Sequence, residues 1–249
     1  MKYTKKISFF ILVLVLFSTT AFSQDKFFAS VSMGKVFPFG QFASSELESK
    51  NSGFSKDGFT LSVDGDYQLH RRWAASLRLN LGNTTFNEKS VIQLLKNEIS
   101  SFTKATDSVQ FDISYWLWIS PMVGVKYNYP IIINKLYVET GIFTGVNFVQ
   151  IPDQNVYFND KEKERTVFSK NMGETDVTFP ITANIAFRYR LNKRMQLKIN
   201  SEYFSTRTAF DHKTFYRMNK GTEAVELNGY HVNVPIKTMN ITLGLVYNL

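Results

Sequence analysis

The sequence contains no cysteine in its 249 residues. The absence excludes a disulfide framework, thiolate chemistry and a lipid-modified cysteine near the N-terminus. The stability of the fold must therefore come from a hydrogen-bonded scaffold or from a large core.

Long apolar runs are also scarce, and the longest lies at the N-terminus, over residues 7–17. It follows three lysines and is shorter than the roughly 20 residues that a membrane-spanning helix needs. The sequence Ala21-Phe22-Ser23 then supplies small residues at the first and third positions of a cleavage site. The pattern predicts a secretory signal peptide over residues 1–23 and a mature domain over residues 24–249.

A strong charge of one sign is missing as well. Removal of the signal peptide takes away three lysines and no acid, which lowers the formal net charge from +8 to +5. Basic and acidic residues are mixed along the chain, so the balance does not indicate nucleic acid as a partner. No metal-ligand spacing and no glycine-rich phosphate loop stands out, and we expect no cofactor.

What the sequence does contain is period-2 alternation of apolar and polar residues, the pattern of half-buried β-strands. The clearest pair of segments is separated by His70-Arg71-Arg72, which reads as a hairpin turn. Eight segments alternate in this way: residues 27–33, 59–69, 73–81, 119–127, 136–142, 177–189, 195–203 and 239–249.

The connections between these segments alternate in length. Short links at 70–72, 128–135 and 192–194 follow the second, fourth and sixth segments, while long polar stretches near 38–57, 83–109, 149–175 and 206–235 follow the odd-numbered segments. This alternation predicts an all-β fold: an eight-stranded antiparallel up-and-down transmembrane β-barrel with short periplasmic turns and long extracellular loops.

Alternation alone leaves open whether the apolar faces point into a soluble barrel or out toward lipid. Eight strands enclose a space just wide enough for side chains, and a soluble barrel would fill that space with large apolar groups. Here the polar set holds small residues and charges of both signs, which favours apolar faces toward lipid. Aromatic residues at the strand ends predict two interfacial girdles, with ordinary β-propensity as the alternative reading. The girdle on the short-turn side is Tyr67, Trp73, Tyr127, Tyr189 and Tyr247; the other is Phe59, Tyr115, Phe148, Phe179 and Tyr203.

The charged residues of the polar face have signs that nearly cancel. They are Asp64, Asp66, Arg78, Lys126, Glu139, Arg188, Arg190, Lys198 and Glu202. Because an unpaired buried charge is very costly, we predict a paired network and a plugged lumen. A selectivity ring or a proton path is the functional alternative.

Three stretches carry a family resemblance: residues 27–34 (FFASVSMG), 37–42 (FPFGQF) and 243–249 (LGLVYNL). They resemble the small outer-membrane barrels of the OmpA/OmpX type, and more closely the PorT-like β-barrel family of Bacteroidota. Leu249 stands where such barrels frequently have a terminal aromatic residue. The resemblance implies a barrel in the bacterial outer membrane and says little about activity.

The long loops offer candidate contact surfaces. Residues 91–102 have helical spacing of apolar residues and predict a short amphipathic helix that caps the barrel mouth or docks a partner. The fourth loop combines aromatic with basic residues, a composition suited to phosphate groups or to a protein partner. The candidate partner-facing residues are Arg207, Phe210, Phe215, Tyr216 and Arg217.

The sequence leads to three hypotheses about function. The first is a non-enzymatic barrel that supports membrane integrity or binds a partner through its extracellular loops. The second is an accessory subunit of an outer-membrane secretion or assembly machine. The third is an enzyme that modifies lipid A or phospholipid, with Ser205, Asp211 and His212 as a triad that lacks a defined geometry. Expected partners are phospholipid, lipopolysaccharide, the barrel-assembly machinery during biogenesis and an envelope protein.

Overall fold

The computed structural model describes residues 26–45, 52–87, 108–113, 115–152, 154–160, 165–171, 175–217 and 225–249. The predicted signal peptide and the predicted helix at 91–102 lie outside these ranges, and both stay predictions. The described residues form thirteen strands and one short 3-10 helix, η1 (Gly40–Phe42). Nowhere in these ranges is there a helix of the length and apolar character that a membrane crossing requires.

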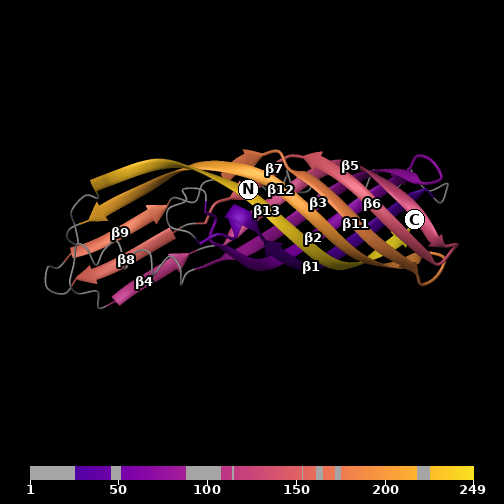
Figure 1. The fold of residues 1–249 in the computed structure, drawn as a ribbon, viewed down its shortest axis with the longest axis horizontal. Helices are drawn as coiled ribbons and strands as arrows, with labels where there is room; N and C mark the ends of the chain where they lie inside the picture. The colour runs from indigo at the N-terminus through magenta and orange to yellow at the C-terminus, as the bar shows by residue number, and fades with distance from the viewer. Residues whose placement is uncertain are drawn as a thin grey trace, which may run out of the picture.

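Eight of the strands close into a ring (Figure 1). In order around it they are β1 (Phe27–Pro38), β2 (Ser55–Gln68), β3 (Trp73–Phe86), β5 (Trp116–Ile132), β6 (Leu136–Gly145), β11 (Ile181–Arg190), β12 (Met195–Arg217) and β13 (Val225–Asn248). Each pairs antiparallel with the ring strand that follows it in sequence, and β13 pairs back with β1. The predicted eight-stranded up-and-down barrel is confirmed. Closure matters because an open edge in hydrocarbon would leave backbone groups unpaired.

The other five strands extend the wall at the end opposite the short turns. β7 (Asn147–Gln150) and β10 (Thr175–Thr178) pair with each other and lengthen the β5, β6 and β11 side of the barrel. β4 (Ser108–Ile113), β8 (Gln154–Asp160) and β9 (Arg165–Asn171) join the far end of β12 in a sheet, visible beyond the barrel in Figure 1.

Two of the predicted long loops are largely strand: 149–175 contains β8 and β9, and 206–235 belongs mostly to β12 and β13. The hairpin of β12 and β13 is paired from Met195↔Tyr247 to Tyr216↔Val225, so most of 206–235 is strand. The polar composition of this segment is typical of a loop, but backbone pairing between β12 and β13 holds it as strand. Residues 177–189 are also not one strand, because Pro180, which has no N–H to donate, separates β10 from β11.

The short turns and both described chain ends lie together at the other end of the barrel. Gln68 N donates to Lys26 O (2.9 Å) and Leu249 N donates to Phe27 O (3.0 Å), which ties the two ends to one rim. The turn predicted at 128–135 is shorter than expected, because β5 continues to Ile132. Asn134 has φ 63°, a left-handed conformation that asparagine tolerates better than most residues.

The two faces of the wall differ sharply in character. Leu77 and Ile142 point outward and are each 67% exposed, whereas Lys126 and Glu139 point inward and are 0% exposed. A soluble protein shows the opposite arrangement. The apolar exterior is the surface that a bilayer covers, as predicted.

Aromatic side chains border this apolar wall at both ends. On the turn side, the rings of Trp73 and Tyr127 lie 4.9 Å apart; on the other side, those of Phe39 and Tyr203 lie 5.9 Å apart. Phe59 and Tyr67 on β2 are separated by eight residues, which for a tilted strand corresponds to a height of roughly 20 Å. The spacing matches the apolar band of an outer-membrane barrel.

Leu77→Arg tests the outward face. Leu77 lies near the middle of the apolar band, between Trp73 and Asn83, which pairs with Phe59. We expect the substitution to destabilise the barrel by about 2–4 kcal/mol, because it places a cation in hydrocarbon. Equilibrium unfolding in phospholipid vesicles measures the change. The matched control is Thr85→Arg, on the same strand but beyond the girdle, with an expected cost of at most about 1 kcal/mol. Equal costs at the two positions would contradict the assigned membrane band.

Candidate functional site

The interior of the barrel is organised around the carboxylate of Asp64 on β2. Arg78 on the neighbouring β3 approaches it with both Nε (2.7 Å) and Nη2 (3.0 Å), a bidentate geometry. Lys126 Nζ on β5 lies 2.8 Å from Asp64 Oδ2, and Lys198 Nζ on β12 lies 3.2 Å from the same atom. One carboxylate thus links four of the eight ring strands.

A second carboxylate, Glu139 on β6, links β6 to β11 and β12. Its Oε1 lies 2.9 Å from Lys198 Nζ and its Oε2 lies 2.8 Å from Arg188 Nη1. Asp66 pairs with Lys126 at 2.8 Å, and Glu202 pairs with Arg78. Asn80 and Asn240 also donate to Glu202 Oε1, at 3.0 Å and 3.2 Å.

The network is electrically neutral, with four carboxylates against four cations. None of the eight side chains is more than 6% exposed. The guanidinium of Arg78 also lies over the ring of Phe143, 3.8 Å from its centroid. Mutual pairing offsets the large cost of taking these charges out of water, and the paired groups occupy the lumen.

The structure places eight of the nine predicted lumen residues in this network. The ninth, Arg190, is the last residue of β11 and lies half-buried at the turn-side mouth. Its guanidinium lies 5.6 Å from the centroid of the Tyr137 ring, and within the described ranges it makes no ion pair. Arg190 lies two residues beyond Arg188, at the end of the strand, and so it lies at the mouth of the barrel and not among the ion pairs of the lumen.

A second, apolar layer, which period-2 alternation does not predict, fills the barrel on the side away from the turns. Trp118 and Phe204 stack inside the wall with centroids 5.8 Å apart, and Phe42 from η1 packs on Trp116 at 5.5 Å. Trp116 Nε1 donates to Gly53 O (3.1 Å). The signal in the sequence is the run Trp116-Leu117-Trp118-Ile119, which is apolar on both faces. The layer consists of Val36, Phe42, Phe86, Trp116, Trp118, Val149, Ile151, Phe204, Val232, Val234 and Ile236.

Gly82 on β3 makes room for this layer. A Cβ atom at Gly82 would lie 2.3 Å from Cε2 of the Trp118 ring. Only glycine permits so close an approach of the ring to the strand. The lumen is consequently closed twice, by ion pairs and by packed aromatic side chains.

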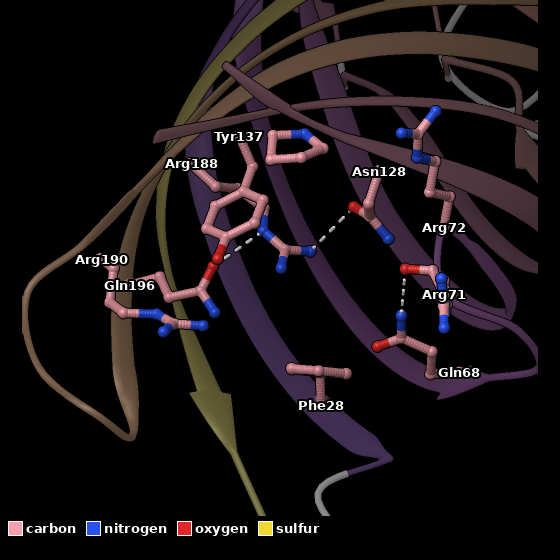
Figure 2. Close-up of a pocket in the computed structure, with 10 residues that line it drawn as sticks. Phe28, Gln68, Arg71, Arg72, Asn128, Tyr137, Arg188, Arg190 and Gln196 are labelled. Carbon is pink, nitrogen blue, oxygen red and sulfur yellow. Dashed lines mark hydrogen bonds between the residues drawn. The ribbon is translucent and has the colours of Figure 1, made fainter. Parts of the chain in front are cut away.

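The turn-side mouth holds a cavity of about 340 Å³ (Figure 2). Arg188 lies at its centre between Tyr137 and Asn128, with Arg190 on one side and two arginines of the β2–β3 turn on the other. Arg72 Nη1 donates to the hydroxyl of Tyr127 (3.1 Å), and this hydrogen bond raises the pKa of Arg72 above its ordinary value. The cavity is lined by Phe28, Gln68, Arg71, Arg72, Asn128, Pro130, Tyr137, Arg188, Arg190 and Gln196.

The predicted partner-facing residues separate into three cases. Arg207 is exposed on β12. Phe210 packs toward the apolar layer, with its ring 6.3 Å from that of Trp116. Phe215, Tyr216 and Arg217 lie in strand β12 and pair with β9, and their side chains are outside what the structure describes.

The residues suggested for a catalytic triad lie along one extended strand. Ser205 and His212 are seven residues apart in β12, which at ~3.3 Å per residue separates them by roughly 23 Å. A nucleophile and its base must approach within hydrogen-bond distance. The strand therefore keeps these two residues apart, and the triad hypothesis is wrong for this pair.

No protein-family model matches the sequence, and no curated protein matches it either. Among solved structures, the chain is similar to the outer membrane protein OprG from Pseudomonas aeruginosa, with 14% identity, a TM-score of 0.48 and coverage of 90% of this chain and 97% of that chain. It is similar to a major outer membrane protein from Thermus thermophilus, with 12% identity, a TM-score of 0.47 and coverage of 89% and 98%. It is also similar to the outer membrane protease OmpT from Escherichia coli, with 10% identity, a TM-score of 0.45 and coverage of 93% and 99%.

The closed ring, the apolar wall between aromatic borders and the charge-neutral interior are the features of an integral β-barrel. Short turns face the periplasm in such barrels, and the longer connections face outward. The protein is an eight-stranded transmembrane β-barrel, with the features that bacterial outer-membrane barrels share.

Asp64→Asn tests the network. The substitution leaves Arg78, Lys126 and Lys198 with one negative charge fewer in an enclosed space, and we expect a loss of roughly 3–5 kcal/mol in the free energy of unfolding. The control is Asp57→Asn, which breaks the exposed 2.9 Å pair with Lys35 and should cost at most about 1 kcal/mol. Denaturant titration in vesicles compares the two. A cost at Asp64 no larger than at Asp57 would contradict the role of Asp64 as the hub.

Proposed function

We propose that the protein is a non-conducting, non-enzymatic outer-membrane barrel that stabilises the envelope and presents its extracellular strand extension to a partner. The observation that carries the proposal is the doubly filled lumen. A pore needs a continuous water path. The interior of an eight-stranded barrel is just wide enough for side chains, and here the ion pairs and the apolar layer fill it. The separation of Ser205 from His212 supports the non-enzymatic part.

The extension beyond the membrane supports the second part of the proposal. From Tyr203 at the outer girdle, β12 continues for 14 residues to Arg217, roughly 45 Å of strand. Pairing with β13 along nearly its whole length, and with β9 over its last four residues, makes it part of a sheet. A preorganised sheet binds with less entropy loss than a loose loop, which suits a contact surface. The partner is an envelope protein or lipopolysaccharide, while phospholipid contacts the wall.

Electrical recording tests the filled lumen. We expect the refolded protein to give no stepwise conductance in a planar lipid bilayer, because both the ion network and the apolar layer obstruct the path. Circular dichroism and a heat-modifiable shift in gel mobility verify that the inserted protein is folded. Sustained, reproducible conductance steps from folded protein would overturn the non-conducting part.

Photo-crosslinking on living cells tests the contact surface. A benzophenone side chain placed at Arg207 or Ala209, both exposed on the extension, should give an adduct of defined mass that mass spectrometry identifies as protein or lipopolysaccharide. The same group at Leu243 on the lipid-facing wall should give phospholipid adducts. A truncated control replaces residues 211–231 by an Asn-Gly turn between Phe210 and Val232, which are paired in the hairpin, and should lose the adduct while the barrel still folds. The absence of any adduct at Arg207 and Ala209 counts against the proposal.

A further inference from the structure

The periplasmic mouth of the barrel has an unbalanced positive charge. Four arginines line its cavity, Arg71, Arg72, Arg188 and Arg190, and no carboxylate does. Of the four, Arg188 alone has an ion-pair partner within the described ranges, the network residue Glu139. The neutrality of the interior therefore ends at the mouth, where three further guanidinium groups add positive charge.

The mouth also holds more hydrogen-bond donors than acceptors. Arg190 Nε is buried and has no hydrogen-bond partner among the residues that the structure describes. Each guanidinium carries five N–H donors, and the cavity lining supplies amide and hydroxyl oxygens only. A buried donor without an acceptor costs free energy. A ligand with several acceptor atoms would therefore bind the N–H groups that have no acceptor in the protein.

The neighbouring side chains hold these guanidinium groups in place. Arg188 donates Nε to Gln196 (3.0 Å) and Nη1 to Asn128 (3.3 Å). Its guanidinium lies 5.7 Å from the Phe28 ring centroid, and that of Arg190 lies 5.6 Å from the Tyr137 ring centroid. Aromatic and amide contacts thus position Arg188 and Arg190, drawn in Figure 2, before any ligand arrives.

The surrounding rim strengthens the electrostatic attraction. Lys26, Lys135, Lys193 and Arg194 stand on the same end of the barrel, and the turns at 69–72, 133–135 and 191–194 contain no acidic residue. Basic groups clustered around a cavity raise the local concentration of anions.

We propose that the periplasmic mouth is a binding site for a phosphate oxyanion. A phosphate group offers several acceptor oxygens and at least one negative charge, and arginine forks bind it through paired N–H donors. A cavity of about 340 Å³ accommodates a phosphate or a diphosphate group. The phosphate comes either from a soluble periplasmic anion or from the headgroup of a phospholipid in the inner leaflet.

The first experiment uses a soluble anion. Inorganic diphosphate is titrated into the folded protein in neutral detergent, with calorimetry as the readout. The pocket variant carries Arg71→Gln, Arg72→Gln and Arg190→Gln; the control carries Lys26→Gln, Lys193→Gln and Arg194→Gln, which removes the same charge from rim residues outside the cavity lining. We expect the pocket variant to weaken binding by about tenfold or more and the control by no more than about threefold, since paired guanidinium contacts exceed screened rim charges.

The second experiment identifies the source of the phosphate. Native mass spectrometry of protein released from nanodiscs of equal phosphatidylglycerol and phosphatidylcholine measures retained lipid. Retention of phosphatidylglycerol by the wild type and the control, but not by the pocket variant, assigns the site to a lipid headgroup. Diphosphate binding without such retention assigns it to a soluble anion. The proposal is overturned if the wild type binds neither ligand, or if the pocket and control variants lose binding equally while both show the heat-modifiable mobility of a folded barrel.

Discussion

Inside a bilayer the backbone has no water to bond with, so every N–H and C=O group of the wall must pair with another strand. The pairing of β13 with β1, from Phe28↔Asn248 to Pro38↔Thr238, meets this requirement by closing the ring. Closure also determines where the side chains lie. Successive side chains of a strand point to opposite faces, so in a closed ring they point alternately outward and into the lumen. Half of the wall must suit lipid, and the other half must fill a cylinder with no access to bulk solvent.

The interior meets that demand in two ways along its length. Toward the periplasm, four carboxylates and four cations cancel around Asp64 and Glu139. Toward the outside, Trp118 and Phe204 lead an apolar layer that packs like the core of a soluble protein. The two layers have different roles. The ion pairs link strands across the ring, and the aromatic side chains close the outer end of the lumen.

Much of the barrel was predictable from the sequence, because period-2 alternation and alternating connection lengths are local signals. The outward Leu77 and the inward Lys126 both follow directly from that pattern. The outer layer was not predictable in the same way. Its members Phe42, Trp118 and Ile236 meet only after the ring closes, and Phe42 reaches them from η1 in a stretch that reads as a loop. The strand extension was missed because the polar composition of residues 206–217 resembles a loop, whereas pairing across 22 positions of β12 and β13 depends on the partner strand.

The two ends of the molecule differ in kind. The outer end is a sheet built on β12 and β13, and the periplasmic end is a compact mouth rich in arginine. Both depend on the wall being oriented with its apolar face outward. Spin labels read this orientation directly in nanodiscs, through their relaxation by lipid-soluble oxygen and by a water-soluble nickel complex. Labels at Val63, Leu79 and Ile241 should be relaxed by oxygen and protected from nickel, while labels at the adjacent inward positions Ser62, Asn80 and Asn240 should be shielded from both reagents. Equal oxygen relaxation on the two faces, or nickel access at the outward positions, would contradict the account.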